Sequence, residues 1–156
     1  MSKTNAVRIL DAKKINYSLH TYEVDEENLD AVTVANKINA EPESVFKTLV
    51  ARGDKNGINV FCIPGNMELD LKKSASISGN KKVEMIKVKE ITDLTGYIRG
   101  GCSPIGMKKE YPTYIDETCN LFDEIYISAG VRGTQIKISP NDLKELINAV
   151  FADLIL

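Results

Sequence analysis

The apolar residues of the chain recur at two different spacings, and each spacing predicts one kind of element. A spacing of three or four residues is typical of a helix with one buried face, whereas alternation is typical of a strand. Thr4 or Asn5, Asp30 and Ser139 are residue types that cap helix starts, because their side-chain oxygens accept a hydrogen bond from a free backbone N–H. In the last helix, Val150 would belong to the core face. The helical spacing predicts helices at about residues 4–14, 31–38, 41–44, 69–78, 89–94 and 139–150.

Short runs rich in β-branched and aromatic residues predict the strands. These runs lie at about residues 17–24, 46–52, 58–63, 83–86, 113–116, 124–128 and 135–139. Asn56 and Gly57 stand between the second and third runs, and this pair favours the tight turn of a β-hairpin. Because the strands do not alternate regularly with long helices, a doubly wound parallel sheet is disfavoured. We therefore expect one mixed α+β domain over residues 1–156, with a curled, barrel-like sheet surrounded by helices.

The composition of the chain limits the classes of protein to which it can belong and the compartment in which it would work. With 156 residues, of which 43% are hydrophobic, the chain can bury a substantial core. Its formal net charge of -2 gives no overall signature of nucleic-acid binding, so contact with RNA would need a local basic patch. No apolar run is long enough to span a membrane. The three cysteines form no CxxC or zinc pattern, which indicates reduced thiols in a cytoplasm and no metal site.

The stretch 100–106 is the most unusual segment of the sequence. It holds Gly100, Gly101 and Gly106, together with a Ser103-Pro104 step. Glycine allows positive φ and a close approach of the backbone to a ligand, and proline fixes its own φ. The segment is therefore either a loop whose backbone N–H groups hold an anion or a carbonyl oxygen, or a rigid turn between two strands.

Lys47 is the first side chain that is a candidate for chemistry. It interrupts the strongly apolar strand predicted over residues 46–52. A lysine with apolar neighbours is either buried, which is costly without a partner, or extends its ammonium to solvent at a sheet edge. The sequence pattern leaves both alternatives open.

Three further side chains could take part in chemistry. Tyr22 and His20 would share one face of an early strand, where they offer a hydrogen-bond donor and an acid or base. A half-buried tyrosine with a solvated hydroxyl is the commoner outcome. Cys102 would act as a nucleophile only beside an activating base, and His20 is the one histidine in the chain. A catalytic Cys102 is therefore disfavoured.

A second glycine-bearing loop, at residues 128–134, could face the first across a pocket. Four basic residues flank the two loops and could form a local basic rim around a phosphate-bearing ligand: Arg99, Lys108, Lys109 and Arg132. Alternatively, these four side chains are ordinary charged residues exposed to solvent and bind no ligand.

Several segments in the same order closely resemble the YbaK/EbsC family, the free-standing relatives of the editing domain inserted in bacterial prolyl-tRNA synthetases. The resemblance covers essentially the whole chain. The segments that carry it are 45–49, 69–73, 81–85, 95–106, Lys108-Lys109, 127–133 and 151–153.

This resemblance implies a trans-editing hydrolase that removes cysteine mischarged onto tRNA(Pro), without a cofactor. Lys47 matches the essential lysine of the family, and Tyr22 matches a tyrosine that lines the pocket. Gly100 and Gly101 match a loop whose backbone N–H groups face the scissile ester, so Lys47, Gly100 and Gly101 are the expected catalytic residues. The residues expected to bind the substrate are Tyr22, Thr48, Ser103, Pro104, Ser128, Gly130 and Arg132.

The chemistry needs no strong nucleophile, because an aminoacyl ester is already activated. Either a bound water or the thiol of the cysteinyl substrate would attack the carbonyl carbon. The resemblance also implies that prolyl-tRNA synthetase is a partner, since a small chain with weak overall charge is poorly suited to selecting a tRNA body. Two alternatives stay open: deacylation of another mischarged tRNA such as Ala-tRNA(Pro), and a non-catalytic module that binds tRNA or a synthetase.

Overall fold

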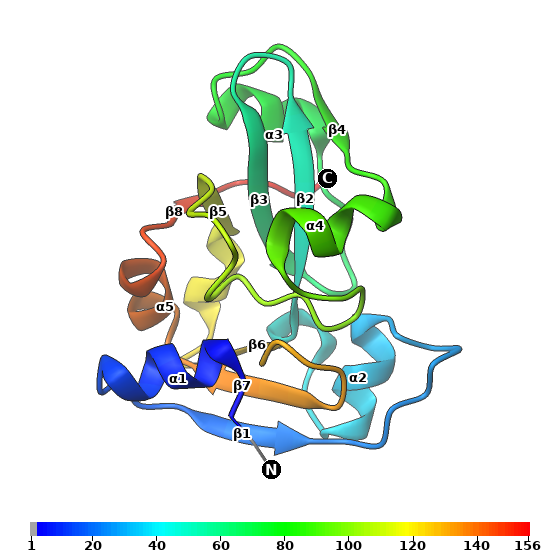
Figure 1. The fold of residues 1–156 in the computed structure, drawn as a ribbon, viewed down its shortest axis with the longest axis vertical. Coiled ribbons are helices and arrows are strands. Elements are labelled where there is room, and N and C mark those ends of the chain that lie inside the picture. Colours follow the sequence, from blue (N-terminus) through cyan, green and yellow to red (C-terminus); the bar gives the residue numbers. More distant parts are fainter. Residues whose placement is uncertain (1–2) are drawn as a thin grey trace.

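Two β-sheets form the framework of the protein in the computed structural model, which describes residues 3–156 (Figure 1). The three-stranded sheet has the order β1-β7-β6, and the five-stranded sheet has the order β4-β2-β3-β5-β8. The first sheet contains β1 (Ser18–Thr21), β6 (Ile125–Ser128) and β7 (Thr134–Ile138). The second contains β2 (Phe46–Gly53), β3 (Gly57–Pro64), β4 (Val83–Met85), β5 (Thr113–Asp116) and β8 (Val150–Ala152).

The pairing of the strands is mixed, as the α+β prediction requires. β2 and β3 form the predicted antiparallel hairpin, whereas β3–β5 and β5–β8 are parallel pairs. The two sheets are joined where Val45, just before β2, makes a parallel bridge to Tyr126 on β6. The mixed α+β class is confirmed, but the strands are divided between two sheets and do not close into one barrel.

The helices are short and begin at the predicted caps. Thr4, Asp30 and Ser139 accept hydrogen bonds from backbone N–H groups in the first turns of α1, α2 and α5. The α-helices are α1 (Asn5–Ala12), α2 (Ala31–Lys37), α3 (Leu71–Ile77), α4 (Ile91–Thr95) and α5 (Pro140–Leu146). Three 3₁₀ turns, η1 (Pro42–Ser44), η2 (Val88–Glu90) and η3 (Glu117–Leu121), complete the set. None of the described helices is long and apolar enough to cross a membrane.

The C-terminal segment differs from the prediction. The last helix was expected to continue to about residue 150, but α5 ends at Leu146 and Val150 begins strand β8. Asn148 has a φ of 56°, a left-handed conformation that asparagine tolerates and that stops a right-handed helix. Val150 therefore lies 46% exposed on an edge strand and not in the core.

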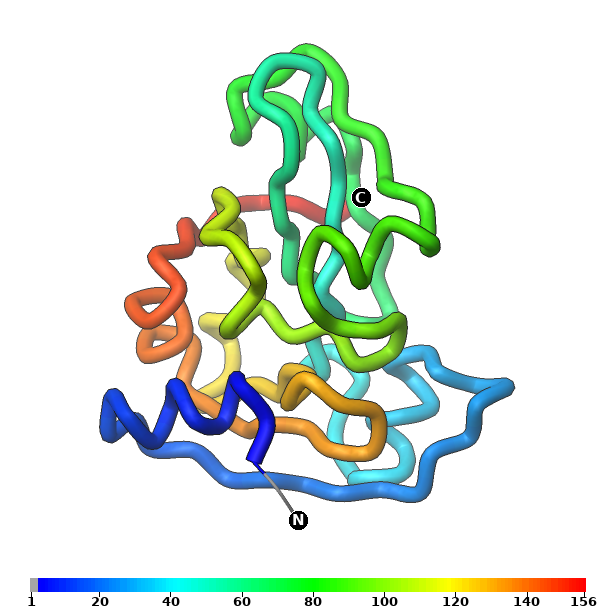
Figure 2. The backbone as a smooth tube through the Cα atoms, in the orientation of Figure 1, coloured from blue at the N-terminus to red at the C-terminus, as the bar shows by residue number. Residues whose placement is uncertain are grey.

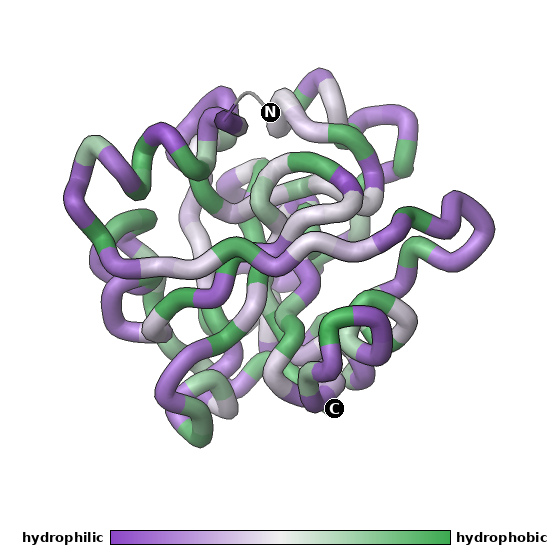
Figure 3. Tube along the Cα trace, turned by 90° about the horizontal axis from the view of Figure 1, so that it is seen from below, coloured by the Kyte–Doolittle hydropathy of each residue, from purple (hydrophilic) through white to green (hydrophobic). Residues whose placement is uncertain are grey.

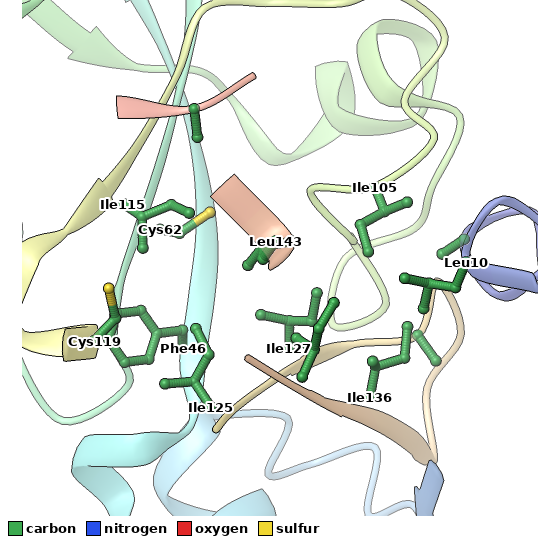
Figure 4. Packing of buried hydrophobic residues seen from close by; sticks show 14 of the residues in the cluster. Leu10, Phe46, Cys62, Ile105, Ile115, Cys119, Ile125, Ile127, Ile136 and Leu143 are labelled. Carbon is green, nitrogen blue, oxygen red and sulfur yellow. The ribbon is translucent and has the colours of Figure 1, made fainter. Parts of the chain in front are cut away.

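The main hydrophobic core lies between the two sheets. Side chains from α1, α5 and both sheets pack together in it, and Phe46 at the start of β2 lies beside Ile125 and Cys119 (Figure 4). Leu10 and Ile105 pack at the other end of the same cluster. The start of β2 is thus anchored on one side by the core, which fixes the position of the next residue, Lys47.

The segment between β1 and α2 projects from the body of the protein (Figure 2). Much of the projecting chain is hydrophilic, as the hydropathy colouring shows when the protein is seen from below (Figure 3). Asp25 stabilises its start by accepting hydrogen bonds from the Glu27 backbone and the Asn28 side chain. Asp30 ends the segment by capping α2.

Candidate functional site

A cavity of about 470 Å³ lies where the two sheets meet. Five parts of the chain line it: the projecting segment with the first turns of α2, the start of β2, Gly65 after the end of β3, the loop of residues 100–106 (the glycine loop) with the preceding Arg99, and the neighbouring strands β6 and β7. Four of the predicted site residues are among the lining residues, namely Lys47, Thr48, Gly100 and Ser128.

The joint between the sheets explains why Lys47 and Ser128 meet at this cavity. Val45 and Tyr126 form an isolated parallel bridge, which brings the start of β2 close to β6, and one residue on each segment lies two positions beyond this bridge. These residues are Lys47 and Ser128, and both line the cavity. The sequence therefore brings them together through tertiary pairing and not through local spacing.

Lys47 is half-buried, which lies between the two alternatives left open by the sequence. Burial lowers the pKa of its ammonium group, and the nearby negative charge of Glu68 opposes that shift. Among the described residues, none of the ion pairs includes Lys47. A cation in this position is suited to bind a phosphate or a hydroxyl oxygen of a ligand.

In the glycine loop, one backbone N–H group is hydrogen-bonded within a tight turn, and two neighbouring N–H groups are not hydrogen-bonded within residues 3–156. The Gly101 N–H donates to the Ile98 carbonyl at 2.9 Å, and Gly100 at the corner of this turn has a φ of 82°. The Gly101 N–H is therefore engaged within the turn, and its predicted contact with a scissile ester stays a prediction. Within residues 3–156 the backbone N–H groups of Gly100 and Cys102 have no hydrogen-bond partner, and both residues line the cavity.

Cys102 contributes a neutral side chain to the cavity wall. Burial raises the pKa of its thiol to about 11, so the thiol is protonated at neutral pH. His20 cannot be assigned to it as a base, because its ring bonds the Ser18 hydroxyl and packs edge-on against Tyr126, and it does not line the cavity. The environment of Cys102 is that of a packed thiol, not of an activated nucleophile.

We predict that Cys102→Ser reduces turnover of the substrate by less than about 3-fold, because the backbone N–H is retained and the protonated thiol has no covalent role. Steady-state kinetics at neutral pH measure the effect, with the wild-type protein in parallel. A loss of about 10³-fold or more would instead assign Cys102 to nucleophilic attack.

Arg132 and Gly130 contact the segment that leads into the glycine loop. The Arg132 Nε donates to the Arg99 carbonyl at 2.8 Å, which holds the turn in place. Gly130 has a φ of 98° and packs so closely on Tyr97 that an added Cβ would lie 2.8 Å from the ring. Neither residue lines the cavity, so their predicted contact with substrate stays a prediction.

Ser103, Pro104 and Tyr22 also lie outside the cavity lining. Ser103 is fully buried and its hydroxyl accepts the Ile105 N–H, whereas Pro104 faces a second hollow between α1 and α5. Tyr22 follows the end of β1, and its N–H bonds the Gly133 carbonyl. Their roles as substrate-binding residues remain predictions that these positions do not test.

The cavity also contains residues that the sequence did not single out for the site. Glu27 and Asp30 add two carboxylates from the projecting segment, and Gln135 adds a carboxamide from β7. Of the proposed basic rim, Arg99 lines the cavity, but Lys108 packs along Gly96 and bonds the Asp93 carbonyl. Among residues 3–156, no group of three His, Cys, Asp or Glu side chains is placed to hold a metal ion.

Comparison of the sequence with known protein families identifies the class of the chain. The sequence model of the aminoacyl-tRNA editing domain matches residues 25–146, a span that includes Lys47, the glycine loop and Ser128. The chain belongs to the aminoacyl-tRNA editing domain family. Tyr22 precedes the matched residues.

Individual relatives place it more closely within that family. The chain is 49% identical over 152 residues to the Enterococcus faecalis protein named "Putative Cys-tRNA(Pro)/Cys-tRNA(Cys) deacylase EbsC", covering 97% of this chain and 93% of that protein. It is 22% identical to a proline–tRNA ligase of Brachyspira hyodysenteriae over 64% of this chain and 17% of the ligase. Among solved structures, "a putative trans-editing enzyme for prolyl tRNA synthetase" superposes with a TM-score of 0.85 at 26% identity, covering 100% of this chain and 99% of that one.

Proposed function

We propose that this protein is a trans-editing hydrolase that removes cysteine from mischarged Cys-tRNA(Pro). One observation carries the proposal: Lys47, Gly100 and Ser128, from three distant segments, line one cavity on an editing-domain fold. The name of the Enterococcus faecalis relative gives the substrate class. Cysteine and proline are close in size, and a hydrophobic pocket rejects so similar a competitor only weakly, so a later editing step is useful.

The cavity offers electrostatic assistance to ester cleavage rather than a protein nucleophile. The N–H groups of Gly100 and Cys102, which have no partner within residues 3–156, would stabilise the negative charge that develops on the carbonyl oxygen. The attacking atom, either a water oxygen or the substrate's own sulfur, bonds to the carbonyl carbon, and the bond to the ribose oxygen breaks. The ribose oxygen leaves with the proton that the attacking water or thiol gives up. Attack by water releases cysteine directly, whereas attack by the sulfur releases a cyclic thioester that water then opens to cysteine. The Lys47 ammonium binds the ribose or the phosphate of the terminal adenosine.

Prolyl-tRNA synthetase is the proposed partner that supplies tRNA selection. The formal net charge of -2 gives the protein little general affinity for a tRNA body. A pull-down at low salt should therefore recover the synthetase together with tRNA(Pro). Absence of the synthetase from such a complex would remove this part of the proposal and leave the hydrolase activity to be judged separately.

The substrate proposal is tested with cysteine, alanine and serine, each charged onto tRNA(Pro). We expect release of cysteine to be fastest and to exceed release in buffer alone. Faster release of alanine or serine would assign the protein to another editing substrate. Binding of tRNA without release of any amino acid would identify a non-catalytic module.

A further inference from the structure

Arg99 is a charged residue of the cavity wall that the proposed chemistry does not use. It stands directly before Gly100, is exposed, and lines the cavity. Within residues 3–156, its guanidinium group takes part in no ion pair and no hydrogen bond. A guanidinium group carries five N–H donors and no acceptor, so it binds anionic and carbonyl oxygens. This one is therefore available to a ligand that enters the cavity.

The backbone of Arg99 is held in a defined position. Its carbonyl oxygen accepts a hydrogen bond from the Arg132 Nε at 2.8 Å. The Gly101 N–H donates to the carbonyl of Ile98, the residue before it. These two bonds fix the turn from which the Arg99 side chain extends. A binding group on a fixed backbone loses less conformational freedom when a ligand binds than one on a mobile loop.

The other basic residues predicted around the glycine loop are engaged or lie elsewhere. Arg132 uses its Nε on a backbone carbonyl, and its guanidinium group lies 4.0 Å from the Glu26 carboxylate. Lys108 also donates to a backbone carbonyl. Lys109 lines the second hollow and not the cavity. Of the predicted basic rim, Arg99 is therefore the residue that can bind a ligand in the cavity.

The two carboxylates of the cavity lining are not partners of Arg99. Each Asp30 carboxylate oxygen accepts a hydrogen bond from Thr33, one from the backbone N–H and one from the hydroxyl group. Glu27 is exposed on the projecting segment, so water and salt screen its charge. The lining holds two carboxylates and two cations, the second cation being Lys47. Because these charges balance, an anion would bind here through direct contact with a cation and not through a general positive field.

The proposed substrate carries such an anion close to its ester. The N–H groups of Gly100 and Cys102 are the proposed site of the ester carbonyl, and Arg99 directly precedes them. The ester is attached to the ribose of the terminal adenosine, and a phosphodiester is attached to the 5′ side of the same ribose. A planar guanidinium group can bind two phosphate oxygens at once, which an ammonium group does less well.

We propose that the Arg99 guanidinium group binds the phosphodiester on the 5′ side of the terminal adenosine, which leaves the Lys47 ammonium for the ribose. The contact would hold the substrate at both ends of its last nucleotide, with the carbonyl at the glycine loop and the phosphate at Arg99. This inference rests on the proposed editing function.

Two stable ligands that differ by one phosphate group test this contact. One is 3′-cysteinylamido-adenosine, in which an amide replaces the ester. The other is the same compound with a methyl phosphodiester at its 5′ oxygen. Calorimetry measures the dissociation constants for the wild-type protein and for Arg99→Gln. We expect the wild-type protein to bind the phosphodiester ligand roughly 10-fold more tightly and the variant to lose that preference. Equal preference in both proteins would overturn the inference.

Lys109→Gln is the matched control. It removes one positive charge close to the same loop, from an exposed residue outside the cavity lining. The control variant should keep the preference for the phosphodiester ligand. If it lost the preference as fully as Arg99→Gln, a general effect of charge would explain the result and the inference would be wrong. Arg99→Lys retains the charge without the planar fork, so it should keep part of the preference and lose it as salt is raised.

Thermal unfolding and single-turnover kinetics separate binding from a structural role. Arg99→Gln keeps the carbonyl that accepts the Arg132 Nε, so its Tm should stay within about 2 °C of the wild-type value. A lower Tm together with equal weakening of both ligands would mean that Arg99 holds the loop in place, and would overturn the inference.

The kinetics with Cys-tRNA(Pro) add a second readout. The phosphodiester is bound equally in the ground state and the transition state, so its loss should affect binding and not the maximal rate. We expect the protein concentration that gives the half-maximal rate to rise roughly 10-fold in Arg99→Gln, and the maximal rate to change by less than about 3-fold. A lower maximal rate with unchanged half-saturation would contradict a phosphate contact.

Failure of this inference can be distinguished from failure of the proposed function. Turnover of Cys-tRNA(Pro) by a wild-type protein that does not distinguish the two ligands overturns the inference alone. No turnover, with the preference for the phosphodiester ligand retained and lost in Arg99→Gln, overturns the hydrolase activity and supports the Arg99 contact. No turnover and no binding of either ligand overturns both.

Discussion

Lys47→Met is expected to lower the rate of cysteine release from Cys-tRNA(Pro) by about 10²-fold or more, while the protein stays folded. Without the ammonium that holds the terminal adenosine, the ester would shift relative to the glycine loop, and a displacement of about 1 Å can cost that much. The fold should tolerate the change, because Lys47 is half-buried without an ion pair among the described residues and burial already lowers its pKa. Single-turnover rates and thermal unfolding measure the two effects.

Lys55→Met is the control for this prediction. Lys55 lies in the turn of the same hairpin, is exposed, and is remote from the lining of the cavity. Its substitution should change the rate by less than about 2-fold. Equal rates for Lys47→Met and the wild-type protein would remove Lys47 from the mechanism.

Gly100→Ala is expected to have the second large effect, again about 10²-fold on the rate. Gly100 has a φ of 82°, and an added Cβ would lie 3.2 Å from the Arg132 Nε and 3.3 Å from the Leu29 Cδ1. The Arg132 and Leu29 side chains must give way by a few tenths of an ångström, and the positive φ strains an alanine at this corner of the turn. Displacement of a catalytic group by about 1 Å can cost this factor. The same single-turnover assay reports the loss.

Gly57→Ala provides a matched control for the backbone strain. Gly57 has a φ of 79° in the hairpin turn, and no atom lies within 4 Å of the added Cβ. Both variants should lose about 1–2 kcal/mol of stability from the left-handed conformation, but only Gly100→Ala should lose activity. Parallel losses of activity in both variants would mean that stability, not loop geometry, explains the effect.

Local chemistry made much of the fold predictable. Asp30 and Ser139 cap helices where the sequence placed them, and the Asn56-Gly57 turn joins the predicted hairpin. The end of α5 was not predictable from hydrophobic spacing, because Val150 continues the helical pattern while Asn148 turns the chain into β8. The division into two sheets depends on non-local pairing, which spacing along the chain does not encode.

The cavity was predictable only in part, for the same physical reason. Lys47 and the glycine loop stand out by composition, and they do line it. Gln135 gave no local signal, since its place beside Ser128 depends on the register of β6 and β7. The turn that engages the Gly101 N–H, and leaves the neighbouring N–H groups without a partner in the described part of the chain, is likewise visible only once the backbone is folded.

The most direct test of the editing function compares the initial rates of deacylation of Cys-tRNA(Pro) and correctly charged Pro-tRNA(Pro) by the wild-type protein. We predict release of cysteine well above the buffer rate and release of proline close to it. Cysteine release no faster than in buffer, or equal release of both amino acids, would contradict a selective editing hydrolase.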